Sequence, residues 1–158
     1  MKGLYPGTFD PITNGHYEII RRASMLFETL IVGVAVSPEK ETLFSIERRV
    51  EMVHEVLQTL TNIEIQQYSG QTVNIAQEID AHVLVRGLRS PADAQYEFEL
   101  ARMNTELAGN IETIFLSSGN NNAFISSSLI RQIASEGGDI AGFVHPTVQQ
   151  ALLAIYKT

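Results

Sequence analysis

Two polar segments, one near each end of the chain, combine residue types that bind anions. The first, residues 7–16 (GTFDPITNGH), contains a glycine that permits a tight turn, a hydroxyl on Thr8 and an imidazole on His16. The sequence predicts that His16 lies in the first turn of a helix, where backbone N–H groups and the helix dipole favour negative charge. A histidine at such a position is, taken alone, more often a cap or a packing residue. The segment therefore indicates a phosphate site only together with a second feature.

The second segment, residues 124–131 (FISSSLIR), supplies that feature. Its three serines place hydroxyls and backbone donors at the start of another expected helix, which suits a chain of phosphates. A serine run alone is usually ordinary N-capping. The sequence contains no G-x-x-x-x-G-K-[ST], and no G-x-G-x-x-G follows the first expected strand. Kinase-like P-loop and dinucleotide-binding functions are therefore excluded.

The elements that must position these segments follow from hydrophobic periodicity. Apolar runs alternate with amphipathic stretches, and no linker or charge block divides residues 1–158, so we expect one domain. The expected strands are 3–5, 30–36, 63–66, 82–85 and 111–116, and the expected helices are 14–27, 45–60, 72–79, 91–107, 127–135 and 146–156. Five strands alternating with helices predict an α/β fold with a doubly wound, five-stranded parallel sheet and helices on both faces.

Helical spacing also predicts which side chains of the helices enter the core. The side chains expected there include Leu26, Met25, Met52 and, in the helix over 91–107, Tyr96, Leu100, Met103 and Leu107. The simplest interpretation of Glu97 is an exposed position that pairs with Arg102 on the same helix.

Ligands of a doubly wound sheet bind outside the carboxyl ends of its strands, so the segments that follow the strands must share one rim. Three of the eleven basic residues, Lys40, Arg86 and Arg89, fall in these segments. In a chain with a formal net charge of −7, cations gathered at one rim indicate a phosphate site. Composition alone explains Lys40 equally well as a solvated loop charge, because Glu39 and Glu41 flank it.

Composition excludes several classes of function. The net charge and a pI near 5.0 argue against nucleic acid as a partner, which requires a basic surface. The absence of cysteine removes thiolate zinc sites, iron–sulfur clusters and thiol catalysis. The longest apolar run, 30–36, is far shorter than a bilayer span, and the first residues lack an apolar signal segment. We therefore expect a soluble, cytoplasmic protein with no membrane partner.

Three segments, 7–16 (GTFDPITNGH), 86–89 (RGLR) and 125–131 (ISSSLIR), resemble in sequence, order and spacing the bacterial phosphopantetheine adenylyltransferases. That family is a branch of the nucleotidyltransferase superfamily, whose signature [HT]-x-G-H stands here at 13–16 (TNGH). The resemblance covers essentially the whole chain. It implies Rossmann-like subunits assembled into a hexamer, dependence on Mg²⁺, and transfer of the adenylyl group of ATP to 4′-phosphopantetheine. The products would be dephospho-coenzyme A and pyrophosphate.

The resemblance also implies roles for individual residues. His16 would stabilise the transition state at the α-phosphate, and Thr8 would help to bind and orient both phosphates. The residues carried over as catalytic are His16, Thr8, Lys40 and Arg89, and those carried over for the acceptor are Thr8, Lys40, Thr72 and Arg86. The residues carried over for ATP are Thr8, Phe9, His16, Gly87, Leu88, Arg89, Glu97, Asn122, Ala123, Phe124, Ile125, Ser126, Ser127 and Ser128. No metal ligand is assigned, and we expect Mg²⁺ to be held mainly by the ATP phosphates and water.

Two alternatives stay open. The first is another adenylyl- or cytidylyltransferase of the superfamily, acting on a mononucleotide or an alcohol phosphate; such relatives generally have His where this chain has Thr13. The second is a nucleotide-binding module that has lost catalysis, which would bind ATP without releasing pyrophosphate. Thr42, residues 70–72 and residues 120–122 depart from the family pattern, and these departures affect the packing of acceptor and adenine rather than the phosphate-binding residues.

Overall fold

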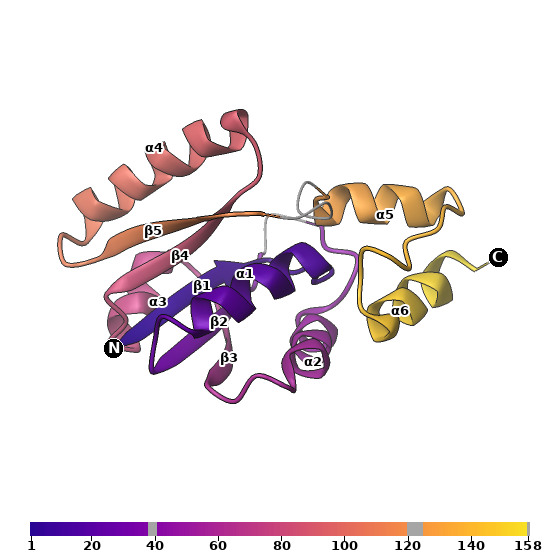
Figure 1. Cartoon of the computed structure of the whole chain (residues 1–158), viewed down its shortest axis with the longest axis horizontal. Coiled ribbons are helices and arrows are strands. Elements are labelled where there is room, and N and C mark those ends of the chain that lie inside the picture. The colour runs from indigo at the N-terminus through magenta and orange to yellow at the C-terminus, as the bar shows by residue number, and fades with distance from the viewer. Residues whose placement is uncertain (38–40, 120–124, 158) are drawn as a thin grey trace.

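The computed structural model describes residues 1–37, 41–119 and 125–157. These residues form a five-stranded parallel sheet with the strand order β3-β2-β1-β4-β5 (Figure 1). The strands are β1 (Lys2–Gly7), β2 (Thr29–Ala35), β3 (Ile63–Tyr68), β4 (Val83–Leu88) and β5 (Glu112–Ser117). The helices are α1 (Asn14–Ser24), α2 (Ile46–Leu57), α3 (Thr72–Glu78), α4 (Pro91–Leu107), α5 (Ser127–Ser135) and α6 (Pro146–Tyr156). The predicted α/β fold with a five-stranded parallel sheet is confirmed.

Both faces of the sheet are buried, because successive side chains of a strand point to opposite faces. Leu4 of β1 pairs in register with Ile31 of β2 and Leu84 of β4, and these three side chains pack in a cluster with residues of α3. Tyr5 and Val32 are the next in-register pair, and they belong to the larger cluster on the other face with residues of α1 and α2. The sheet is therefore doubly wound, as the alternation of strands and helices predicts.

The last two helices extend the larger cluster beyond the sheet. Helices α5 and α6 pack against each other, α6 also contacts α2, and Ile130, Val148 and Leu152 belong to the cluster that covers the α1 and α2 face. Figure 1 shows both helices to the right of the sheet, with α6 below α5. This packing brings the start of α5 to the carboxyl ends of the strands.

Four helices that begin at this rim, α1, α2, α4 and α5, start with side-chain caps. The hydroxyl of Thr13 accepts the His16 backbone N–H at the start of α1, and the hydroxyl of Ser45 accepts the Arg48 N–H at the start of α2. The hydroxyl of Ser126 caps α5 in the same way. Such caps satisfy backbone donors that have no partner within the helix, so they fix where each helix begins.

Helix α4 does not pack as its periodicity predicts. It is 17 residues long. Neither α4 nor any other helix within the described ranges is both long and apolar enough to cross a bilayer. Tyr96 is 62% exposed, and Met103 and Leu107 are also more than half exposed, while Leu100 is partly buried. The expectation that this stripe is buried in the core is therefore wrong for the single chain.

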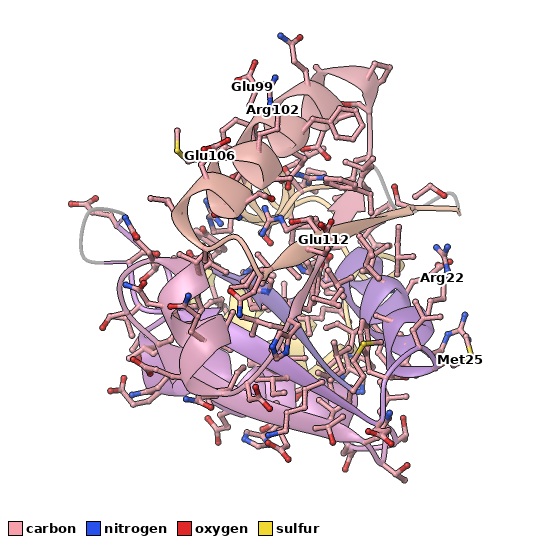
Figure 2. All side chains as sticks on the ribbon, turned by 90° about the vertical axis from the view of Figure 1, so that its left-hand side faces the viewer. Arg22, Met25, Glu99, Arg102, Glu106 and Glu112 are labelled. Carbon is pink, nitrogen blue, oxygen red and sulfur yellow. The ribbon has the colours of Figure 1, made fainter. Side chains whose placement is uncertain are left out.

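On the side turned towards the sheet, α4 carries Glu97 and two alanines, and Phe98 packs edge-on against Phe115 of β5 with the ring centroids 5.0 Å apart. Ala94 and Ala101 are partly buried there, and Glu97 is only 5% exposed. The apolar stripe of Tyr96, Met103 and Leu107 is left exposed on the flank of the helix. Glu97 therefore does not lie on an exposed face with Arg102, which Figure 2 shows on the outer surface of α4, and that interpretation is wrong.

Two methionines expected in the core are also exposed. Met52 of α2 is fully buried as predicted, but Met25 and Met103 are not. Helix α1 ends at Ser24 rather than near residue 27, so Met25 and Leu26 leave the helical face that packs on the sheet. Figure 2 shows Met25 at the surface beyond the end of α1.

Candidate active site

A cavity of about 520 Å³ opens at the carboxyl ends of the strands. The predicted site residues that line it are Thr8, Phe9, His16, Arg86, Gly87, Arg89, Glu97, Ile125, Ser126, Ser127 and Ser128. Of the other predicted residues, Leu88 and Thr72 do not line it, and Lys40, Asn122, Ala123 and Phe124 lie outside the described residues. The fold thus brings the two polar segments from opposite ends of the chain to one cavity, with β4 contributing the residues between them.

The ring of His16, at the third position of α1, is fixed by local hydrogen bonds. Its Nδ1 accepts the Thr13 backbone N–H at 3.0 Å, and the Thr13 hydroxyl accepts the His16 backbone N–H at 3.3 Å. This reciprocal arrangement is a capping box in which histidine takes the place usual for Glu or Gln. The ring also packs edge-on against Phe9, with the ring centroids 5.0 Å apart. Because Nδ1 is an acceptor, the proton of the neutral ring lies on Nε2.

The surroundings of His16 keep the imidazole uncharged. Burial in the cavity wall, together with the positive charges of Arg89 and Arg86, lowers the pKa of His16 to about 4. Each of these effects disfavours the imidazolium form. Near neutral pH the ring is therefore neutral, and its Nε2–H is a hydrogen-bond donor in a cavity that also contains cations.

Arg86 and Glu97 form a bidentate ion pair between β4 and α4. Nε and Nη2 of Arg86 each donate to one carboxylate oxygen of Glu97 at 2.7 Å, and Nη1 donates to the Pro6 carbonyl at 3.2 Å. Burial opposes the charge on Arg86, but the hydrogen bonds and negative charge of Glu97 outweigh it and raise the pKa of Arg86. The bidentate contact fixes the plane of the guanidinium. Arg86 is therefore held in one orientation at the end of β4, and the ATP contact of Glu97 stays a prediction.

Two other arginines of the cavity also lie beside carboxylates. The Arg89 backbone N–H donates to Asp93 Oδ2 at 3.0 Å, and the Arg89 Nε lies 3.8 Å from the same oxygen. Arg131 Nη1 donates to the Asp10 carbonyl at 2.5 Å and lies 3.6 Å from Asp10 Oδ2. Every arginine that lines the described part of the cavity thus has an acidic neighbour, with which a bound phosphate would compete.

The serine hydroxyls at the start of α5 are used within the protein. Ser126 accepts the backbone N–H three residues further on at 3.1 Å, as ordinary N-capping predicts. The hydroxyl of Ser127 donates to the Pro11 carbonyl at 2.7 Å, and that of Ser128 accepts from a guanidinium N–H at 3.3 Å. Ser126 and Ser128 only accept in these contacts, so their O–H groups are available as donors to an anion at this helix start, together with backbone N–H groups of the first turn.

Tyr68 extends the cavity towards β3. It lines the cavity, and its hydroxyl lies 3.2 Å from the Thr72 hydroxyl at the start of α3. Thr72 itself does not line the cavity, so its contact with an acceptor stays a prediction. The rim rule could have indicated Tyr68, because it is the residue at which β3 ends.

Sequence reasoning also missed Asp10 and Arg131, although both stand inside the two polar segments. Their signal was available, since Asp10 follows Phe9 in the first segment and Arg131 closes the second. Both residues line the cavity and contact each other. The two segments are thus joined directly by side-chain contacts and not only by the sheet.

No group of three or more histidine or carboxylate side chains in the described part of the chain is arranged to hold a metal ion. Asp10, Asp93 and Glu97 line the cavity, but their carboxylates already accept hydrogen bonds from the protein. These carboxylates are therefore poor direct ligands. The donor set fits a Mg²⁺ ion that is held by nucleotide phosphates and water, which stays a prediction.

Comparison with known proteins gives one family match and several structural likenesses. A family model described as cytidylyltransferase-like matches residues 4–133. A Vibrio parahaemolyticus protein described as a nicotinate-nucleotide adenylyltransferase has a TM-score of 0.73 at 21% identity, over 96% of this chain and 97% of that one. A lipopolysaccharide core biosynthesis protein from Thermoplasma volcanium has a TM-score of 0.57 at 19% identity, over 76% and 98%. At these identities the two structures show a shared fold.

Proposed function

The chain belongs to the cytidylyltransferase-like family of nucleotidyltransferases, and we propose that it transfers the adenylyl group of ATP to 4′-phosphopantetheine. The products are dephospho-coenzyme A and pyrophosphate. Support for this acceptor comes from the sequence, because RGLR at 86–89 and Thr13 at the first position of the TNGH motif are typical of the phosphopantetheine branch. We propose that the reaction takes place in the cytoplasm and involves no nucleic acid.

The observation that carries the proposal is the neutral imidazole of His16 in a cavity lined by arginines. In the reaction, an oxygen of the acceptor phosphate attacks the α-phosphorus of ATP. The bond from the α-phosphorus to the bridging oxygen breaks, and pyrophosphate leaves with the electron pair. The attacking phosphate is already an anion, so no general base is needed. The protein has to align two phosphates and stabilise the charge that develops between them.

In this scheme we propose a task for each of four residues that line the cavity. His16 donates its Nε2–H to an oxygen of the α-phosphate, and Thr8 helps to orient the two phosphates. Arg86 binds the acceptor phosphate, and Arg89 binds the ATP phosphates. Bound to the triphosphate, Mg²⁺ would neutralise part of its charge. Lys40 is proposed for the acceptor phosphate on the resemblance alone.

The experiment that tests this function is pyrophosphate release by the purified protein with Mg·ATP. The acceptors are 4′-phosphopantetheine, nicotinate mononucleotide and nicotinamide mononucleotide, each alone, with a no-acceptor control. We expect release that depends on phosphopantetheine. Release with a mononucleotide only would assign the protein to another branch of the superfamily. ATP binding without release in any arm would identify a binding module.

We further propose that the chain assembles with copies of itself into a hexamer through the flank of α4. Tyr96, Met103 and Leu107 are exposed at helical spacing there, although such a stripe is usually covered. The outer surface beside it carries charges of both signs, from Arg102 and two glutamates (Figure 2). A surface with an apolar stripe and both charges is suited to a second copy of the same chain.

Light scattering coupled to gel filtration tests the assembly. We expect the mass of a hexamer for the natural chain and a smaller species for Met103→Glu, because a buried charge would oppose the contact. Glu64→Gln, exposed on β3 at the opposite edge of the sheet, serves as the matched control. A monomer at high protein concentration would contradict the proposed assembly.

A further inference from the structure

A buried guanidinium that the proposed reaction does not use lies behind the cavity. Arg49 of α2 is only 2% exposed and is not one of the residues that line the cavity. Its Nη1 donates to the carbonyls of Thr8 at 2.7 Å and Ala35 at 2.8 Å, and its Nε donates to the Phe44 carbonyl at 3.2 Å. One side chain thus connects the residue after β1, the last residue of β2 and the loop before α2.

Asp10 completes this buried network from the other side of the same loop. It is 4% exposed, and its two carboxylate oxygens accept the backbone N–H groups of Leu43 at 2.8 Å and Phe44 at 2.9 Å. The Phe44 peptide groups are therefore held by Asp10 at the N–H and by Arg49 at the carbonyl. Burying charges is costly unless they are hydrogen-bonded, and both charged groups here make several hydrogen bonds to the backbone.

The contact with Thr8 determines how one peptide group faces the cavity. The Thr8–Phe9 peptide is trans, because the cis bond found in the described chain is Asp10–Pro11. In a trans peptide the carbonyl and the N–H point in opposite directions. The Thr8 carbonyl accepts from Arg49, which is not one of the residues that line the cavity, and the Phe9 N–H of the same peptide is directed away from Arg49, while Thr8 and Phe9 both line the cavity.

This peptide would not hold its orientation without support. Phe9 has a φ of 51°, in the left-handed region that is unusual for a residue with a side chain. Such conformations persist when surrounding contacts impose them, and they concentrate at functional sites. Here the imposed contacts are the Arg49 hydrogen bond before Phe9 and the Asp10 network after it.

We infer that Arg49 is a positioning residue for phosphate binding: it holds the Thr8 carbonyl from behind the cavity and thereby aims the Phe9 N–H at the nucleotide phosphates. The inference rests on the proposed function, since it takes the nucleotide as the ligand. Arg49 acts through the peptide and touches no substrate. Its guanidinium is suited to the task because a planar fork can reach three carbonyls in fixed directions, which a lysine ammonium cannot.

Steady-state kinetics of Arg49→Lys test this inference. The lysine keeps the charge beside Asp10, so the protein should fold, but the Thr8 peptide loses its fixed orientation. We expect kcat for pyrophosphate release to fall by about 100-fold, as for a small misplacement of a catalytic donor, with a smaller change in KM for ATP. Arg48→Lys, next in sequence and partly exposed in its ion pairs with Glu51 and Glu55, should match the natural enzyme.

The variant Val53→Ala distinguishes a positioning role of Arg49 from a purely structural one. Val53 is fully buried on the same helix and has no contact with the cavity, so this variant lowers stability without moving Thr8. Both variants are assayed well below their melting temperatures. A natural kcat in Arg49→Lys, or an equal fall in kcat in Val53→Ala, would overturn the inference.

A spectroscopic readout separates this inference from the proposed function. In protein labelled with ¹⁵N-phenylalanine, the Phe9 amide, identified from a Phe9→Leu variant, should shift when Mg·ATP is added, and the shift should be much smaller in Arg49→Lys. A Phe9 amide that does not respond to saturating Mg·ATP contradicts the role of Arg49. A shift without pyrophosphate release from any acceptor supports that role and contradicts the proposed function.

Discussion

The cavity combines two kinds of hydrogen-bond donor, which come from different parts of the fold and for which we propose phosphate binding. At the start of α1 the donor is the uncharged imidazole of His16, held by a hydrogen bond from Thr13 three residues before it. At the end of β4 the donor is the charged guanidinium of Arg86, held by Glu97 on α4. The first group depends on one helical turn, whereas the second depends on how α4 packs on the sheet.

From this difference we expect the two groups to have different roles, one in the chemical step and the other in substrate binding. A neutral donor fixed by local contacts needs no rearrangement as charge develops on the α-phosphate, which is the condition for stabilising a transition state. A cation already bound to a carboxylate must change or share its partner when a phosphate binds, which suits binding and release of substrate. We therefore expect His16 to act mainly on kcat and Arg86 mainly on the KM of the acceptor.

The largest expected effect follows from removing the neutral donor. His16→Ala should lower kcat by roughly 100-fold or more with little change in KM for ATP, because the lost hydrogen bond acts mainly in the transition state. Steady-state pyrophosphate release measures both constants. His82→Ala, an exposed histidine far along the chain, is the control. Near-natural turnover in His16→Ala would remove His16 from the mechanism.

Removing the charged group, Arg86, should change mainly KM rather than kcat. Arg86→Ala should raise KM for the phosphorylated acceptor by roughly 10- to 100-fold, the loss of a charge-assisted hydrogen bond, and raise KM for ATP far less. Arg86→Lys, which keeps a charge beside buried Glu97, is the second variant. Arg102→Ala on the outer surface of α4 is the control (Figure 2). Equal effects on the two KM values would show that the substrate phosphates are assigned to the wrong residues.

The pH dependence of the free energy of unfolding tests whether His16 is held neutral in the folded protein. The pKa of His16 is about 4 in the folded protein against 6.5 ordinarily, so between these values the unfolded chain binds a proton that the folded chain does not. The stability that comes from keeping His16 neutral is therefore fully present above pH 6.5. As the pH falls through 4, the free energy of unfolding decreases by roughly 2 to 3 kcal/mol because of this group.

Urea unfolding at pH 7 and pH 4.5 measures this loss. His16→Gln is the reference variant, because glutamine also suits the third position of a capping box but does not titrate. The natural protein should lose more stability than His16→Gln over this range, and kcat of the natural enzyme should be nearly flat between pH 6 and 8. Equal losses in the two proteins would mean that the imidazole is not held neutral.

The smallest expected effect concerns the start of α5, where the donors are uncharged, as they are at the start of α1. Ser126→Ala removes the cap of α5 and should lower the free energy of unfolding by about 1 kcal/mol. Because Ser126, Ser127 and Ser128 at this helix start line the cavity, KM for ATP should rise several-fold. Ser135→Ala, at the far end of the same helix, is the control. A loss of stability with an unchanged KM for ATP would separate α5 from nucleotide binding.

The part of the site that could be predicted from the sequence is the part whose contacts are local. The strands and helices follow from periodicity, and the rim rule places Thr8, Arg86 and Arg89 at one cavity. The histidine at the helix start could be identified because its cap lies within TNGH. Its low pKa could not be predicted, since the burial of the ring and the nearby charges of Arg89 and Arg86 both arise only in the folded chain.

Contacts between elements explain what sequence reasoning missed. Glu97 and Arg86 are 11 positions apart on a helix and a strand, and only the packing of α4 turns the carboxylate inward. Periodicity correctly identifies an apolar stripe at Tyr96 and Met103, but a stripe does not reveal whether it packs on its own sheet or on another chain. The three carbonyls gathered by Arg49 belong to distant segments, and their pattern leaves no signal in side-chain types.

The measurement that tests the central claim most directly is a competition between acceptors. The purified protein is incubated with Mg·ATP and equal concentrations of 4′-phosphopantetheine, nicotinate mononucleotide and nicotinamide mononucleotide, and the adenylylated products are identified by mass spectrometry. The proposed function predicts dephospho-coenzyme A as the main product, with pyrophosphate released in equal amount. A dinucleotide as the main product, or no adenylylated product while ATP binds, would contradict it.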